Sequence, residues 1–177
     1  MRKQTFRWGL WGFLFTLAAG TALHFSWDWC GRSRLAASVM AVNESVWEHM
    51  KMLFIPAFVF SIAQWAVSGR GRPGFSAVRG VSVLLGTLFI PVAYYTYTGA
   101  LGIHATWVDV LIFVLAAALM WGADLAWTER GAMTRPWQQV MGFIILWALL
   151  FAFVWCTYRP PHLPLWQDPV TQLYGIP

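Results

Sequence analysis

Apolar side chains fall into five long stretches along the chain, and short polar or basic segments separate them. The stretches run over residues 6–29, 46–67, 78–98, 106–127 and 137–158. Each is close to the roughly 20 residues that an α-helix needs to cross a bilayer. The first stretch follows basic residues, as a signal peptide does, but it is too long for one and no small-residue cleavage site follows it. The pattern therefore predicts an all-α fold, a polytopic membrane helix bundle with about five transmembrane helices.

Composition supports a membrane protein and excludes an ordinary soluble domain. Hydrophobic residues make up 59% of the chain and charged residues only 11%, whereas a globular domain carries about 25% charged residues. Thirteen tryptophans fit aromatic belts at two membrane interfaces. The net charge of +5 is spread over short loops. We therefore expect the lipid bilayer, and no nucleic acid, as a partner, with a membrane protein or a second copy as further candidates.

The basic residues predict the orientation of the bundle. Eight of the twelve Lys and Arg residues fall on one side of the predicted topology: Arg2, Lys3, Arg7, Arg70, Arg72, Arg79, Arg130 and Arg135. The loop 99–105 has none, and only Arg32 and Arg34 weaken the bias from the first outer loop. By the positive-inside rule the N-terminus is cytoplasmic and the C-terminus extracytoplasmic.

The acidic residues and histidines gather on the other side. Nine of the eleven fall there: His24, Asp28, Glu44, Glu48, His49, His104, Asp109, His162 and Asp168. Ionisable groups in or near a bilayer are costly, so a one-sided cluster predicts a functional site. Asp124 is on the cytoplasmic side, where we expect it to pair with an arginine such as Arg130 or Arg135; a proton path is the alternative.

Two segments outside the stretches complete a single integral membrane domain over residues 1–177. Residues 159–177 form a Pro-rich extracytoplasmic tail, whose five prolines exclude a sixth helix. Its aromatic residues favour a position along the outer interface. Residues 35–42 are too short to cross a membrane and predict either an interfacial helix or a re-entrant segment.

Two outer segments carry the residues of a candidate metal site. His24 and Asp28 share a helix face, where they bind a metal, relay protons or satisfy each other. In residues 43–51, Ser45 and Glu48 fit a capping box, which needs neither Glu44 nor His49. Carboxylates and imidazoles at this spacing suit a divalent cation or an acid–base pair. Zinc or another divalent cation is thus a candidate cofactor, with ligands from the set His24, Asp28, Glu48 and His49.

A third outer segment is rich in tyrosine. Three of the five tyrosines lie where the third predicted helix ends: Tyr94, Tyr95 and Tyr97. An interfacial belt is the simple interpretation, but side chains so close together on a helix point in several directions, so at least one should face the bundle. Asp109, beyond His104, needs a partner such as Lys51, a tyrosine hydroxyl or a bound cation.

Cys30 and Cys156 are the only cysteines, and the topology places both at the outer interface. A disulfide between them is one expectation, because the extracytoplasmic side is oxidising. It requires the first and last helices to be neighbours. Two unrelated thiols at helix ends are the alternative.

Two motifs resemble the signature of a family. Asn43-Glu44-Ser45-Val46-Trp47-Glu48-His49-Met50-Lys51 and Tyr94-Tyr95-Thr96-Tyr97-Thr98-Gly99 are similar to segments of a functionally uncharacterised family of small bacterial multi-pass membrane proteins. The resemblance implies a multi-pass protein of the bacterial inner membrane. It implies no activity.

Three functional classes fit an outward-facing pocket built from the residues His24, Asp28, Glu44, Glu48, His49, Tyr94, Tyr95, Tyr97, His104 and Asp109. The first is a protein that binds or transports a cation, a proton or a small polar solute. The second is a metal-dependent hydrolase that acts at the outer leaflet, with metal-activated water. The third is an accessory subunit whose polar patch docks a partner. We rank binding or transport first, because an enzyme needs a more complete constellation than spacing shows.

The predicted topology can be tested with a reporter fused to the C-terminus. We expect a reporter that works only outside the cytoplasm to be active at this position, because the positive-inside rule places the C-terminus on the extracytoplasmic side. A reporter that works in the cytoplasm should be silent at the same position. The reverse result would contradict the orientation.

Overall fold

Five long α-helices form the protein in a computed structural model that describes residues 2–177. They are α1 (Arg2–Trp29), α2 (Val46–Gln64), α3 (Phe75–Leu101), α4 (Thr106–Glu129) and α5 (Pro136–Tyr158). Short 3₁₀ turns, η1 (Ala36–Ser38) and η3 (Pro164–Trp166), precede α2 and follow α5, and a π-helical turn, η2 (Trp65–Gly69), extends α2. Each predicted stretch corresponds to one of these helices, so the all-α prediction is confirmed.

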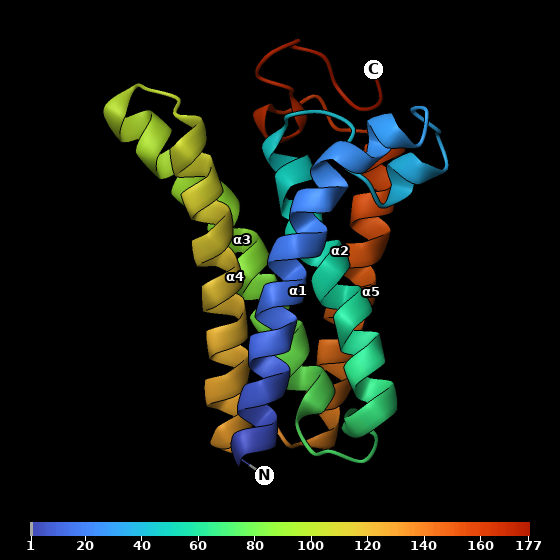
Figure 1. Ribbon diagram of the computed structural model, residues 1–177, viewed down its shortest axis with the longest axis vertical. Coiled ribbons are helices and arrows are strands. Elements are labelled where there is room, and N and C mark those ends of the chain that lie inside the picture. Colours follow the sequence, from blue (N-terminus) through green and yellow to red (C-terminus); the bar gives the residue numbers. More distant parts are fainter. Residues whose placement is uncertain (1) are drawn as a thin grey trace.

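The helices run along the long axis of one bundle, with the N-terminus at one end and the C-terminus at the other (Figure 1). We call these the N-terminal end and the C-terminal end. α2 is the most buried helix and packs against α1, α3 and α5. α1 also packs against α4, and α3 packs against both α4 and α5. Toward the C-terminal end, the α3–α4 hairpin leans away from the other helices (Figure 1).

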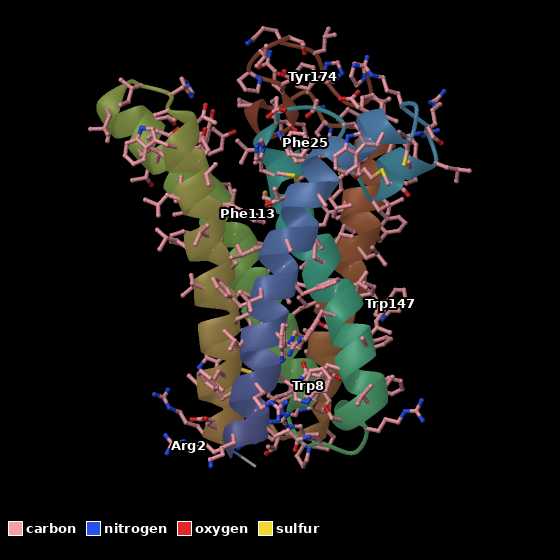
Figure 2. The ribbon with its side chains drawn as sticks, in the orientation of Figure 1. Arg2, Trp8, Phe25, Phe113, Trp147 and Tyr174 are labelled. Carbon is pink, nitrogen blue, oxygen red and sulfur yellow. The ribbon has the colours of Figure 1, made fainter. Side chains whose placement is uncertain are left out.

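Four of the helices are long and apolar enough to cross a membrane: α2 with its π-helical turn, α3, α4 and α5. Many apolar side chains point outward in Figure 2, among them Trp147 of α5. Such a surface suits contact with lipid, as expected for a multi-pass membrane protein. A fifth crossing by α1, which carries the basic residues Arg2, Lys3 and Arg7, stays a prediction.

Glycines allow the closest helix contacts in the bundle. Gly80 of α3 faces Gly142 of α5, and an added Cβ on either would meet backbone atoms of the other helix. Gly20 of α1 accommodates the ring of Phe113 from α4, which points toward α1 in Figure 2. Small residues at such positions let membrane helices approach closely.

The predicted disulfide is not formed. Cys30 is an exposed free thiol beyond the end of α1, and Cys156 is a half-buried free thiol in α5. The reason lies in the helix order, because α1 packs against α2 and α4 while α5 packs mainly against α3. The two cysteines therefore follow the alternative of two unrelated thiols.

The contact between α3 and α5 predicts a strong effect of one added methyl group. We expect Gly142→Ala to destabilise the bundle by about 1–3 kcal/mol, the usual cost of overpacking, because its Cβ would meet the Ser76 carbonyl and Ala77 Cα. Gly122→Ala is the matched control, since no atom lies within 4 Å of an added Cβ there. Thermal unfolding of the purified variants in detergent measures the difference; equal stabilities would contradict this packing.

Candidate metal centre

The start of α2 organises the candidate site. Ser45 is the N-cap of α2, and its Oγ accepts a hydrogen bond from the Glu48 N–H at 3.4 Å. The Ser45 N–H in turn donates to Asn43 Oδ1 at 2.9 Å. The second half of the predicted capping box is wrong, because the Glu48 carboxylate accepts the N–H of Val42, not that of Ser45, at 3.2 Å. The N-cap thus holds the chain just before α2 in one conformation.

Three potential metal ligands meet at this point, from α1 and from both sides of the N-cap. Glu44 Oε1 lies 3.7 Å from His24 Nε2, and Glu44 Oε2 lies 3.7 Å from His49 Nε2. One ligand atom from each residue can be chosen so that all lie within 4.8 Å of one another. Two imidazoles and one carboxylate form a ligand set that proteins use for zinc and other transition metals.

The orientation of His49 suits a metal ligand. Its Nδ1 lies 2.9 Å from the Ser45 carbonyl oxygen, which can only accept a hydrogen bond. In the neutral imidazole, Nδ1 then carries the proton and the lone pair of Nε2 points toward Glu44. A backbone carbonyl in this role is common among metal-bound histidines. The site is open to solvent, because 48% of the Glu44 side-chain surface is exposed.

Two of the four predicted metal ligands lie elsewhere. Asp28 is exposed and pairs with Arg32, whose Nε lies 2.8 Å from Asp28 Oδ1. Glu48 is buried and pairs with Lys51. The structure therefore brings His24 and His49 together as expected. The carboxylate beside them is that of Glu44, whereas the sequence predicted those of Asp28 and Glu48.

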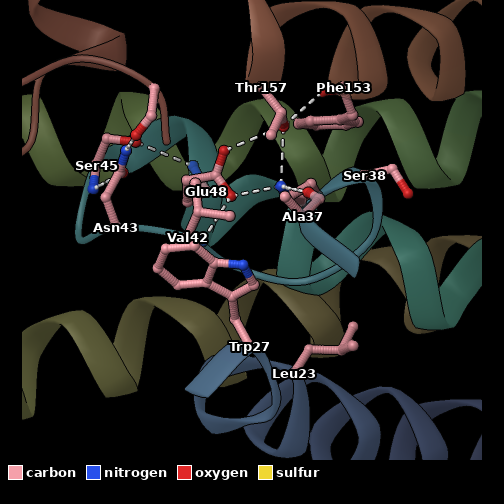
Figure 3. A network of polar contacts seen from close by, with 12 residues as sticks. Leu23, Trp27, Ala37, Ser38, Val42, Asn43, Ser45, Glu48, Phe153 and Thr157 are labelled. Atoms are coloured by element: carbon pink, nitrogen blue, oxygen red, sulfur yellow. Dashed lines mark hydrogen bonds and ion pairs between the residues drawn. The ribbon is translucent and has the colours of Figure 1, made fainter. Parts of the chain in front are cut away.

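Glu48 belongs to a buried network instead (Figure 3). The Lys51 ammonium lies 2.5 Å from Glu48 Oε2, 3.0 Å from the Ala37 carbonyl oxygen and 2.9 Å from Thr157 Oγ1. These three acceptors match the three donors of an ammonium group. They come from α2, η1 and α5 respectively. The network therefore ties three separate segments together through Glu48, the residue directly before His49.

The tyrosine cluster is a separate group at the ends of α3 and α4. The Tyr97 hydroxyl donates to Asp109 Oδ1 at 2.7 Å, so a tyrosine, not Lys51, is the partner of Asp109. The Tyr94 hydroxyl lies 3.1 Å from His104 Nδ1. Tyr94, Tyr95 and His104 line a cleft of about 400 Å³ whose other wall is the C-terminal tail. Asp109 and the three residues of the candidate metal centre do not line this cleft.

A second buried network lies toward the N-terminal end, and the sequence analysis missed it. Arg79 is 2% exposed and binds both carboxylate oxygens of Asp124, with Nε–Oδ1 at 2.9 Å and Nη2–Oδ2 at 3.2 Å. It also donates to Ser61 and Gln64 of α2. The expected partners Arg130 and Arg135 were therefore wrong. The available signal was that Arg79 and Asp124 both lie within predicted apolar stretches, where ionisable side chains usually pair with one another.

Residues 1–176 match the model of a family that is described as "Family of unknown function (DUF6512)". The chain belongs to DUF6512. This confirms the expectation of a functionally uncharacterised family, and a bacterial origin of the DUF6512 chain stays a prediction. No curated protein and no solved structure matches the chain.

The buried Glu48–Lys51 pair predicts a non-additive response to mutation. We expect Lys51→Met alone to destabilise the protein by about 3–5 kcal/mol, because it leaves a buried carboxylate without its partner. The double variant Lys51→Met with Glu48→Gln should recover part of this loss, since the buried charge is then removed. Asp28→Asn is the control and should cost about 0–1 kcal/mol, as for an exposed ion pair. Thermal unfolding in detergent measures all three, and additive losses would contradict the coupling.

Proposed function

We propose that this member of DUF6512 is a five-helix membrane protein that binds a divalent cation, Zn²⁺ in the first place, through His24, Glu44 and His49. The observation that carries the proposal is the convergence of these three side chains, one from α1 and two from the start of α2. Glu44 lies 3.7 Å from each imidazole, through a different carboxylate oxygen for each, and one ligand atom per residue can be chosen within 4.8 Å of the others. Tetrahedral ligands bound about 2.0–2.1 Å from zinc are roughly 3.3 Å apart, so the three side chains must move closer together on binding.

The position of the centre supports a role at the extracytoplasmic face. The centre lies at the C-terminal end of the bundle, and the basic residues favour an extracytoplasmic location for that end. α1 runs the length of the bundle beside the four more apolar helices (Figure 1). With α1 as the fifth crossing, the termini lie on opposite sides of a bacterial inner membrane. The centre then faces ions that are present outside the cytoplasm.

Binding of the cation fits the surroundings better than its passage through the bundle. The two buried ionic networks lie toward opposite ends, and each engages its own charged groups. Between them the core is mainly apolar, with Leu53, Phe54 and Val83, and its buried polar groups are neutral hydroxyls such as that of Thr87. Within residues 2–177, no charged group in this region offsets the cost of removing a cation from water. The structure thus favours capture of a cation at one face.

A metal-dependent hydrolase is the second candidate, favoured by one feature of the centre. Three protein ligands leave a fourth position of a tetrahedral zinc ion open, as in catalytic zinc sites. Catalysis also needs a general base beside the metal-bound water. Of the other nearby carboxylates in residues 2–177, Asp28 pairs with Arg32, Glu48 pairs with Lys51, and Asp168 accepts backbone N–H groups on both oxygens. We therefore rank binding above hydrolysis.

Metal analysis of the purified protein tests the proposal. We expect about one Zn²⁺ per chain after loading and desalting, and a loss of binding by about 10-fold or more in His49→Ala and Glu44→Gln, because each removes one of three ligands. His104→Ala is the matched control, since this imidazole is at the same end but bonds to Tyr94. Retention of zinc by both ligand variants would contradict the site. Absence of zinc from the wild type would favour an accessory subunit that docks a partner.

A further inference from the structure

Glu44 lies in an irregular connection between η1 and α2, yet hydrogen bonds hold three successive residues of this connection, two through the backbone and one through a side chain. The Val42 N–H donates to Glu48 Oε2 at 3.2 Å. The Asn43 side chain donates through Nδ2 to the Gly175 carbonyl oxygen at 2.8 Å. The Glu44 N–H donates to Asp168 Oδ2 at 3.4 Å. Two of these three contacts come from the C-terminal tail, residues 159–177.

The tail is itself folded around Asp168. This side chain is buried, with 5% of the residue exposed. Its Oδ1 accepts the N–H groups of Val170 at 2.7 Å and Thr171 at 3.1 Å. The Asp168 N–H donates to the Leu173 carbonyl oxygen at 3.0 Å. The two oxygens of this carboxylate therefore make different contacts: Oδ1 closes the turn of the tail, and Oδ2 holds the backbone of Glu44.

Aromatic packing seats the tail on the bundle. The Trp166 ring lies 4.9 Å from the Trp47 ring of α2, measured between centroids, and the Trp47 ring lies 4.6 Å from that of Phe153 in α5. Within the tail, His162 and Tyr174 stack at 4.7 Å with nearly parallel rings. Such contacts give the tail a fixed position against α2, so the hydrogen bonds to residues 43 and 44 are made from a rigid support.

We propose that the tail is a clamp that positions Glu44 in the metal centre, with Asp168 and Asn43 as its positioning residues. The inference rests on the proposed metal centre and adds the regulation of that centre. Outer-shell groups of this kind orient metal ligands and tune affinity. Because coupling between two equilibria is reciprocal, the metal also stabilises the docked tail. Docking of the tail and metal binding therefore favour each other.

Two substitutions between a carboxylate and an amide side chain test the clamp. Asp168→Asn keeps an acceptor for the turn of the tail but replaces the acceptor of the Glu44 N–H with a donor. Asn43→Asp keeps the acceptor for Ser45 but removes the donor to Gly175. We expect each to weaken zinc binding by about 10-fold or more, the usual cost of losing an outer-shell partner. Asp28→Asn controls for the loss of a negative charge at this end and should bind zinc like the wild type.

Asn43→Asp separates the clamp from electrostatics. On charge alone, an added carboxylate beside the centre tightens the binding of a cation, whereas loss of the clamp weakens it. Hydrogen exchange of residues 159–177 gives an independent reading of docking. We expect zinc to slow this exchange in the wild type and to have little effect in Glu44→Gln.

The outcomes distinguish the two proposals. If wild type binds zinc and His49→Ala does not, while Asp168→Asn and Asn43→Asp both match the Asp28→Asn control, the metal centre stands and the clamp is wrong. Exchange in the tail that is unchanged by zinc in the wild type would also overturn the clamp. If the wild type binds no zinc, the metal centre fails, and the clamp fails with it because there is no ligand to position.

Discussion

A buried ammonium group must find three acceptors, and this requirement at Lys51 determines the architecture of the C-terminal end. Its acceptors come from η1, α2 and α5 (Figure 3). An unpaired charge in a membrane protein is costly enough that the three segments cannot separate independently. Glu48, which neutralises Lys51, also accepts the N–H of Val42. The same ion pair thus also fixes the segment before α2, which contains Glu44.

The pair Arg79–Asp124 has the corresponding role toward the N-terminal end, where it joins α3 to α4 and, through Ser61 and Gln64, to α2. The guanidinium also lies over the Trp121 ring, 4.4 Å from its centroid. Both networks include α2, so the central helix is bound near each of its ends. Two buried polar networks therefore hold the bundle together, with a mainly apolar core between them. The packing of the helices does not depend on the candidate metal centre.

The helices followed from the sequence because length and hydropathy alone determine them, and Ser45 was recognised as an N-cap from its local spacing. The residues of the proposed metal site were predicted less well. Residue spacing within a helix correctly placed His24 and His49 near the C-terminal end, but it could not show that Asp28 turns to Arg32. Glu48 was wrongly chosen as a ligand for a similar reason. Spacing could not show that Glu48 and Lys51 are both buried and therefore pair with each other. Arg79 was counted only among the basic residues of the cytoplasmic side, because such a count does not consider where each side chain points.

The location of the tail has a consequence for the order of biosynthesis. Residues 159–177 follow all five helices along the chain, yet they complete the surroundings of Glu44, which precedes four of the helices. During translation, His24, Glu44 and His49 emerge long before Asp168 is made. With the proposed extracytoplasmic C-terminus, these early residues meet their partners in the tail only after the last segment has crossed the membrane. Completion of the proposed centre is then a late event, and it marks a fully inserted molecule.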